Sequence, residues 1–345
     1  MAPQPSPAVQ VQALPSARSR VWQHALRFQS FFGLGAILLL ATILSPTRAN
    51  GSIVFLAPDN LLNIARFASE NGIIAIGMTL VILTAGIDLS VGAVLALCAV
   101  GAAACLSRYH LGAWPSIGLM LALGAGIGAL NGLITTRLAI QSFITTLAML
   151  SAARGVASLW AGGYAIPLAF GTDKGDAPPL FKSLFAGQIG VFGLPVPAQL
   201  VFFLGAGALA AALLKRTGFG RHVYAVGSNE TAARLAGVRV ARVKVIVFSI
   251  SGFLAGLAAL LHAALVNQGS HIDGQGYELN AIAAVVIGGT SLSGGRGGVG
   301  GTMIGALILS ILDNILGLRN IQSEYQLILK GAIIVLAVVL QRGRD

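Results

Sequence analysis

Residues 215–244 read KRTGFGRHVYAVGSNETAARLAGVRVARVK and form a basic segment between two apolar stretches. The segment holds seven of the 22 Lys and Arg residues of the chain, against a single acid, Glu230. Loops rich in Lys and Arg stay on the cytoplasmic side of membrane proteins. The segment therefore predicts a cytoplasmic loop within a chain that crosses a membrane several times.

Composition supports a membrane protein over its whole length. The chain has 345 residues, of which 56% are apolar and only 10% charged, whereas soluble domains carry roughly 25% charged residues. The formal net charge of +11 is attributed to membrane topology and not to nucleic-acid binding, because no aromatic residues are interleaved with the basic ones. We expect an all-α, polytopic membrane protein without a sizeable soluble domain.

Hydropathy predicts a cytoplasmic N-terminal tail at 1–27 followed by a transmembrane domain at 28–345, with about ten spans. A signal peptide is the alternative for the first apolar run, but no small-residue cleavage site follows it. The span at 279–292 is unusually short. The predicted spans are 28–45, 62–84, 90–106, 115–136, 140–160, 198–214, 245–265, 279–292, 299–317 and 325–341.

The distribution of basic residues orients these spans. Of the 22 Lys and Arg residues, 14 fall in the segments predicted to be inside. This bias predicts that both termini are cytoplasmic. It also makes 161–197 the longest outer loop, which is periplasmic in a bacterium; its Gly and Pro residues predict ordered turns.

Glycines recur at a spacing that allows close helix packing. Pairs four residues apart include Gly128 with Gly132 and Gly252 with Gly256, and such pairs let helix backbones approach in a membrane. Residues 85–92 (AGIDLSVG) also resemble residues 288–295 (GGTSLSGG). That similarity fits either an internal repeat or chance in a Gly-rich chain.

Ionisable residues within or near spans are candidates for function. Arg66 and Glu70 are spaced to pair on one helix face, and Lys330 is placed to pair or to extend its amine toward the interface. Arg154 and Asp313 have the same two interpretations. The two cysteines, Cys98 and Cys105, are expected to be small buried hydrophobic residues.

A turn at residues 86–90 precedes a predicted helix. Asp88 and Ser90 are suited to accept hydrogen bonds from the free backbone N–H groups at that helix start. A role in gating or in subunit contact is the alternative for Gly86, Asp88 and Ser90.

No catalytic constellation and no metal-ligand spacing is apparent in the sequence. The LSGG at 292–295 resembles part of a nucleotide-binding signature, but the chain contains no GxxxxGK[ST] phosphate loop. We therefore interpret 292–295 as a tight turn, and we expect a transport subunit that is no enzyme and holds no cofactor.

A short helix is predicted at 228–237 within the basic segment. It has a capping residue, an Ala-rich body, an i, i+4 pair between Glu230 and Arg234, and a closing Gly237. A short helix in a cytoplasmic loop is suited to contact a soluble partner.

Four stretches carry a resemblance to a known family. Residues 78–97, 131–155, 220–260 and 277–309, which include TAGIDLSVGAVLAL, GSNETAARLAGVRVARVK and GGTSLSGGRGGVGG, resemble the membrane permeases of ribose-type sugar importers of the ATP-binding-cassette (ABC) class. The similarity runs from about residue 60 to the C-terminus.

The resemblance implies a homodimer in the bacterial inner membrane. A cytoplasmic ATP-binding subunit would bind the ATP, and a periplasmic sugar-binding protein would deliver the sugar. The family's cytoplasmic coupling helix falls on residues 228–237, which makes these residues the expected contacts for the ATPase: Ser228, Asn229, Glu230, Ala232, Ala233, Arg234 and Gly237.

Two other classes of function fit the sequence less well. A stand-alone, ion-coupled secondary transporter would need several acids deep in the membrane, and few are present. A membrane enzyme would need a catalytic cluster, and the sequence shows none.

The sequence leaves the transported sugar open. A pentose such as ribose, arabinose or xylose, a hexose, or a sugar-like signal molecule are the alternatives. The residues expected to line the transport path are Asn71, Gln141 and Asn267.

Overall fold

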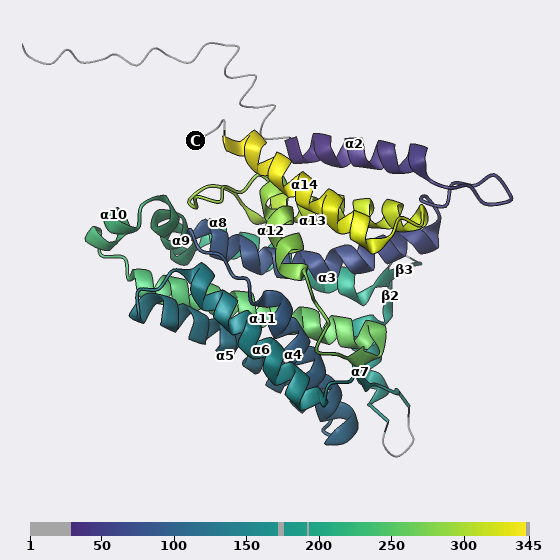
Figure 1. The fold of residues 1–345 in the computed structure, drawn as a ribbon, viewed down its shortest axis with the longest axis horizontal. Coiled ribbons are helices and arrows are strands. Elements are labelled where there is room, and N and C mark those ends of the chain that lie inside the picture. The colour runs from purple at the N-terminus through teal and green to yellow at the C-terminus, as the bar shows by residue number, and fades with distance from the viewer. Residues whose placement is uncertain (1–28, 172–175, 192, 343–345) are drawn as a thin grey trace, which may run out of the picture.

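The structure is a computed structural model that describes residues 29–171, 176–191 and 193–342. The predicted tail at 1–27 lies outside the described residues. The chain folds into a bundle of helices with two small antiparallel β-ribbons (Figure 1). The helices before the basic segment are α2 (Gln29–Leu44), α3 (Pro58–Leu83), α4 (Val91–Ala103) with a π-helical turn (Ala104–Arg108), α5 (Ala113–Arg137), α6 (Ser142–Ala161), α7 (Pro179–Ala186) and α8 (Ala198–Arg216).

The second half contains three short helices and three longer ones: α9 (Gly218–Ser228), α10 (Glu230–Leu235), α11 (Val240–Val266), α12 (Tyr277–Ile287), α13 (Val299–Leu318) and α14 (Ser323–Arg342). Strand β1 (Ile166–Pro167) pairs with β4 (Gln268–Gly269), and β2 (Gln188–Val191) pairs with β3 (Leu194–Pro197). The predicted ordered loop at 161–197 therefore contains β1, α7 and the β2–β3 hairpin.

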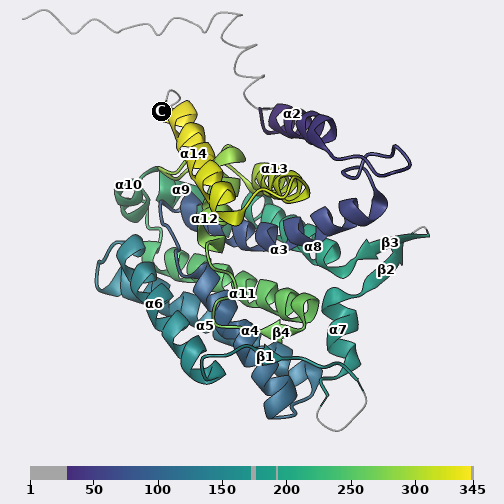
Figure 2. The same cartoon turned by 45° about the vertical axis from the view of Figure 1, so that its right-hand side comes forward.

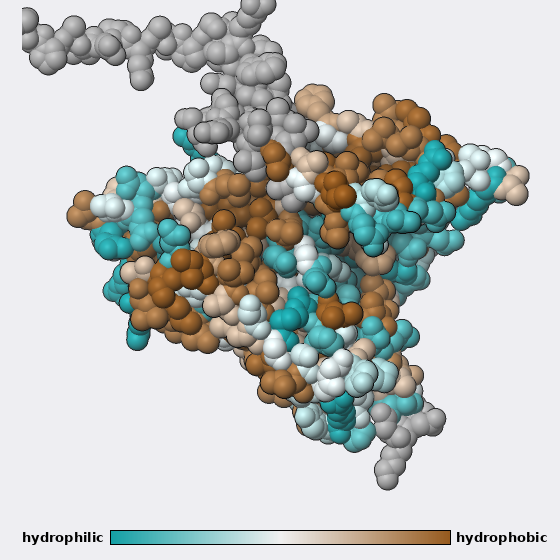
Figure 3. All heavy atoms as spheres, viewed as in Figure 1, coloured by the Kyte–Doolittle hydropathy of each residue, from teal (hydrophilic) through white to brown (hydrophobic). Residues whose placement is uncertain are grey.

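Seven helices in the described part of the chain are long and apolar enough to cross a membrane. Two shorter apolar helices, Ser30–Leu44 and Tyr277–Ile287, accompany them. Hydrophobic residues gather over α2, α5 and α6, and hydrophilic ones at the end formed by α9 and α10 (Figure 3). The prediction of a predominantly helical membrane protein is confirmed, while seven full-length helices stand where about ten spans were expected.

The helix found at the short predicted span, 279–292, is shorter than predicted. Helix α12 covers only 11 residues and ends at Ile287, because two glycines follow and Gly289 adopts a φ of +86°, which favours glycine. Helix α12 packs on α3 and α13 (Figure 2).

Helices α3 and α4 form the centre of the bundle, with 83% and 89% of their apolar windows buried, whereas α5 and α6 lie at the periphery. The two free cysteines are buried in this centre, as predicted. The largest helix interface joins α5 to α11, and glycines allow it: a Cβ on Gly128 would overlap the carbonyl of Phe248, and one on Gly252 would overlap that of Gly124. The predicted close packing at these glycines is confirmed.

Candidate functional site

The basic segment contains two short helices, and the second of them, α10 (Glu230–Leu235), is the short helix predicted at 228–237. Ser228 is the last residue of α9, and Asn229 caps α10 by accepting a hydrogen bond from the Ala232 N–H at 2.9 Å. Gly237 follows α10 with a φ of +83°, a conformation that glycine adopts without strain. The segment presents α10 at one end of the bundle (Figure 1).

An ion-pair network fastens α10 to α11. The Glu230 carboxylate contacts Arg234 at 2.9 Å, as predicted, and also Lys244 at 2.6 Å. The side chain of Lys244 is only 18% exposed. Its hydrogen bond to Glu230 is the main cause that lowers the pKa of that carboxyl below the ordinary value, although partial burial opposes it. The contact between Glu230 and Lys244 therefore connects α10 to the first turns of α11.

The two faces of α10 differ in exposure. Ala233 is 5% exposed and packs against the protein, whereas Leu235 is 85% exposed. Of the seven residues expected to contact an ATPase, Ala233 thus faces inward. Leu235 was not among the seven, because a sequence cannot show which side of so short a helix points outward.

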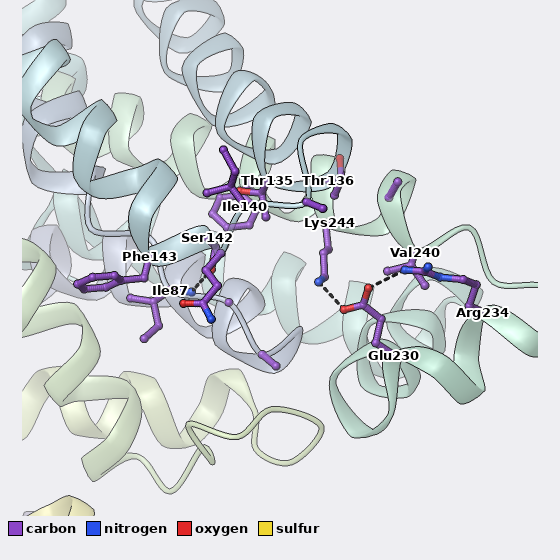
Figure 4. A pocket seen from close by; sticks show the side chains of 16 residues that line it. Ile87, Thr135, Thr136, Ile140, Ser142, Phe143, Glu230, Arg234, Val240 and Lys244 are labelled. Carbon is purple, nitrogen blue, oxygen red and sulfur yellow. Dashed lines mark hydrogen bonds and ion pairs between the residues drawn. The ribbon is translucent and has the colours of Figure 1, made fainter.

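A cavity of about 520 Å³ separates α10 from the body of the bundle. Its charged wall carries Glu230, Arg234 and Lys244, and the opposite wall carries Thr135 and Ser142 (Figure 4). The lining includes Gly86 and also Gln141, one of the expected path residues, at the α5–α6 connection.

Asp88 is the centre of a buried polar network. Its carboxylate accepts hydrogen bonds from the Ser90 N–H (3.0 Å), the Ser90 hydroxyl (2.6 Å) and the Ser251 hydroxyl (3.0 Å). The Asn131 amide donates to the Ser90 hydroxyl at 2.9 Å. Asp88 thus accepts from the backbone at the start of α4, as predicted. Ser90 caps no backbone group, since its hydroxyl binds side chains.

The turn that contains LSGG packs beside the turn at 84–86. The Gly295 N–H donates to the Leu83 carbonyl at 3.0 Å, and the Tyr224 hydroxyl of α9 donates to the Gly297 carbonyl at 3.0 Å. The interpretation of 292–295 as a tight turn is confirmed. The two segments of similar sequence, 85–92 and 288–295, meet at one point, where Gly294 packs against Ala85 and the carbonyl of Gly227 in α9.

A second polar cluster contains Glu70 and His262, and the predicted pairing of Arg66 with Glu70 is wrong. Arg66 donates to Asn63 at 3.0 Å, and Glu70 instead contacts Nδ1 of His262 at 2.6 Å. The other ring nitrogen, Nε2, lies 3.5 Å from Asp273. Nearly 200 residues separate Glu70 from His262, so no local spacing signals their contact.

The expected path residues do not come together. Gln141 lies at the cavity beside α10, while Asn71 lines another cavity beside α12. Asn267 ends α11 with a φ of +55°, and its carbonyl accepts from the Leu168 N–H at 2.8 Å. Near the second cavity, Lys330 pairs with Asp313 at 2.9 Å, the pairing option predicted for both.

A bundle of long apolar helices that carries a basic two-helix loop at one end defines the class: a polytopic membrane protein. The fold is similar to that of a metal-chelate type ABC transporter solved in an inward-facing conformation. The TM-score is 0.52 at 16% identity, over 89% of this chain and 98% of that one.

The family model of the permease component of branched-chain amino acid transport systems matches residues 60–338, and the chain belongs to this family. It is 44% identical to the ribose import permease of Escherichia coli (strain K12) over 90% of this chain and 92% of that protein. The ribose import permease of Bacillus subtilis (strain 168) is 42% identical over 91% and 92%. The xylose transport system permease of Escherichia coli (strain K12) is 32% identical over 94% and 95%.

These similarities confirm the predicted ABC permease class and a multi-pass location in the inner membrane. Relatives of this kind are transport components and not enzymes. The secondary-transporter alternative is not favoured, since the similar proteins and the similar fold belong to ABC systems.

Proposed function

We propose that this chain is the permease subunit of an ATP-driven importer that carries a monosaccharide, with ribose as the first choice among the pentoses. The observation that carries the proposal is the 44% identity that extends over 92% of a ribose import permease. Similarity to a xylose permease is lower, at 32%, which ranks ribose ahead of xylose.

The proposed assembly contains two copies of this chain, an ATP-binding subunit on the cytoplasmic side and a sugar-binding protein on the periplasmic side. ATP belongs to the partner, because this chain lacks a phosphate loop. The excess of Lys and Arg at 215–244 supports a cytoplasmic place for this loop and for both termini. The loop at 161–197 then faces the periplasm.

The proposed coupling element is α10 with its flanks, residues 228–237. Closure of the ATPase on ATP would move α10, and the 2.6 Å contact between Glu230 and Lys244 would pass the movement to α11. Exposed Ala232 and Leu235 offer a contact surface to the ATPase. The turn at Gly86, Asp88 and Ser90, which bonds to α11 through Ser251, is the proposed gate.

Uptake in proteoliposomes tests the proposal. The permease is reconstituted with its ATP-binding and sugar-binding subunits, and entry of labelled D-ribose is measured with and without internal ATP. We expect ATP-dependent entry. If no monosaccharide among ribose, xylose, arabinose and glucose enters, the importer proposal is wrong.

Docking is tested separately with two matched variants of exposed apolar residues. Leu235 in α10 and Tyr164 in the loop at 161–197 are 85% and 81% exposed. We expect Leu235→Glu to abolish co-purification of the ATP-binding subunit, because a carboxylate would be buried in the contact. Tyr164→Glu should leave that co-purification unchanged. Equal ATPase binding by both variants would place the docking surface elsewhere.

A further inference from the structure

A cavity of about 560 Å³ lies among α3, α12, α13 and α14. This volume falls within the range of about 300–1,000 Å³ that is typical of small-molecule sites. The walls combine apolar side chains with eight polar ones: Asn71, Gln275, Tyr277, Asn280, Ser310, Asp313, Asn314 and Lys330.

One wall of the cavity is the start of a helix that spans only part of the membrane. The 11 residues of α12 extend about 16 Å, against a hydrocarbon thickness of about 30 Å. Its C-terminal end leads into the turn at 288–298 beside α9, so its first residue, Tyr277, lies within the bundle. Tyr277 lies opposite Glu70 and Asn71, which are midway along the 26 residues of α3.

The chain reaches this depth without helical structure. Residues 269–274 run along α4, because Gly269 packs on the carbonyl of Ala99 and Gly274 on that of Gly92. Non-helical backbone at membrane depth is tolerated only where protein buries it or where it lines a cavity with water. Discontinuous helices of this kind form the substrate sites of many transporters.

The polar cluster described above fixes this segment. Arg154 of α6 donates to the carbonyls of His271 and Asp273, both at 2.6 Å. His262 of α11 bridges Asp273 and Glu70. The start of α12 is therefore held from three helices, which keeps its polar groups in place at the cavity.

The polar groups that face the cavity have spare hydrogen-bonding capacity. Within the part of the chain that the structure describes, the side chains of Gln275 and Asn280 have no hydrogen-bond partner, and Asn71 has only a long bond of 3.5 Å to the Phe67 carbonyl. Carboxamides both donate and accept, as sugar hydroxyls do. The pair of Asp313 and Lys330 adds no net charge.

We infer that this cavity binds the transported sugar, as a neutral polyhydroxylated ligand, midway through the permease, and that Asn71 and Asn280 hydrogen-bond its hydroxyls. A net-neutral site rich in carboxamides suits a sugar better than an anion or a metal ion. The inference rests on the proposed import function and names its internal binding site.

Apolar variants of the two asparagines test the inference in the reconstituted complex. We expect Asn280→Leu and Asn71→Leu each to lower ribose uptake about tenfold, since each removes a hydrogen bond to a bound hydroxyl. Co-purification of the ATP-binding subunit should persist. Gln322→Leu, at an exposed position before α14 and outside the cavity lining, is the control and should transport normally. Uptake within twofold of wild type in both cavity variants would overturn the inference while the import function stands.

A labelling experiment separates the cavity from the transport function. Asn280→Cys is exposed in the complex to a water-soluble thiol reagent with and without D-ribose, xylose or glucose. The two native cysteines are buried, and wild type measures their background. We expect labelling, slowed severalfold by the transported sugar. A thiol that does not react, or one that no sugar protects, overturns the inference, whether or not the wild type imports ribose.

Discussion

Asp88 and Ser90 together join three helices by hydrogen bonds. The two carboxylate oxygens of Asp88 accept from Ser90 at the start of α4 and from Ser251 in α11, and Ser90 in turn accepts from Asn131 in α5. Each accepted bond is worth roughly 1 kcal/mol, and more where the donor would otherwise be buried without a partner. Asp88 therefore contributes both stability and a defined geometry to the proposed gate.

Replacement of Asp88 with alanine tests that contribution. Asp88→Ala leaves the Ser90 N–H and two hydroxyls without their acceptor, so we expect a loss of about 2–4 kcal/mol in stability. The apparent Tm in detergent should fall clearly, and Asp88→Asn, which keeps one acceptor oxygen, should fall less. An unchanged Tm for Asp88→Ala would contradict the role assigned to the network.

Lys244 links the exposed α10 to the membrane helix α11. Since Glu230 is 42% exposed, solvent weakens the pair, and surface pairs contribute at most about 1 kcal/mol. We expect Lys244→Met to lower ribose uptake roughly two- to fivefold while ATP hydrolysis continues. The variant would then uncouple uptake from hydrolysis. Arg239→Met, on the same loop, is the control; an equal loss in both variants would mean that charge alone matters.

The pH dependence of this contact follows from the lowered pKa of Glu230. A carboxyl whose pKa is lowered in the folded state contributes stability above its unfolded pKa and loses it only as the pH falls through the lowered value. We therefore expect coupling to be constant between about pH 6 and pH 8. Measurement of the ratio of uptake to ATP hydrolysis across this range checks the expectation.

At the scale of elements, the interface between α5 and α11 depends on glycines, which have no side chain. Gly252 packs against the carbonyl of Gly124, and a Cβ at residue 252 has no room. Lipid provides no hydrophobic drive for helix association, so close backbone contact is what holds such helices together. The close fit of the two backbones therefore sets the position of α5 against α11.

A pair of alanine variants tests this packing. We expect Gly252→Ala to destabilise the protein by about 1–3 kcal/mol through overpacking. Gly126→Ala on α5, where a Cβ meets nothing within 4 Å, should be neutral or slightly stabilising. Thermal unfolding in detergent compares the two, and equal Tm values would show that the interface accommodates a Cβ at residue 252 and is not closely packed there.

At the scale of the whole molecule, the source of energy distinguishes an importer subunit from an autonomous carrier. The end of the bundle with α9 and α10 carries hydrophilic residues (Figure 3), which suits contact with a soluble partner. We expect uptake in membrane vesicles to stop when ATP is removed and to persist when a protonophore collapses the proton gradient. The reverse pattern would favour an ion-coupled secondary transporter.

Local sequence determined the class of this protein. Hydropathy, the clustering of Lys and Arg at 215–244, and the spacing of small residues act over one loop or one helix, so they predicted a helical membrane permease with a basic loop. The turn at 292–295 and the pair of Glu230 with Arg234 were predictable for the same reason. The family resemblance likewise depended on contiguous stretches.

Tertiary structure decided which distant groups meet. Glu70 pairs with His262 and not with its neighbour Arg66, Ala233 turns inward while Leu235 points out, and α12 stops at 11 residues beside a polar cavity. Contacts between residues some 200 positions apart depend on how helices cross, and the periodicity of one helix carries no information about the helix that packs against it.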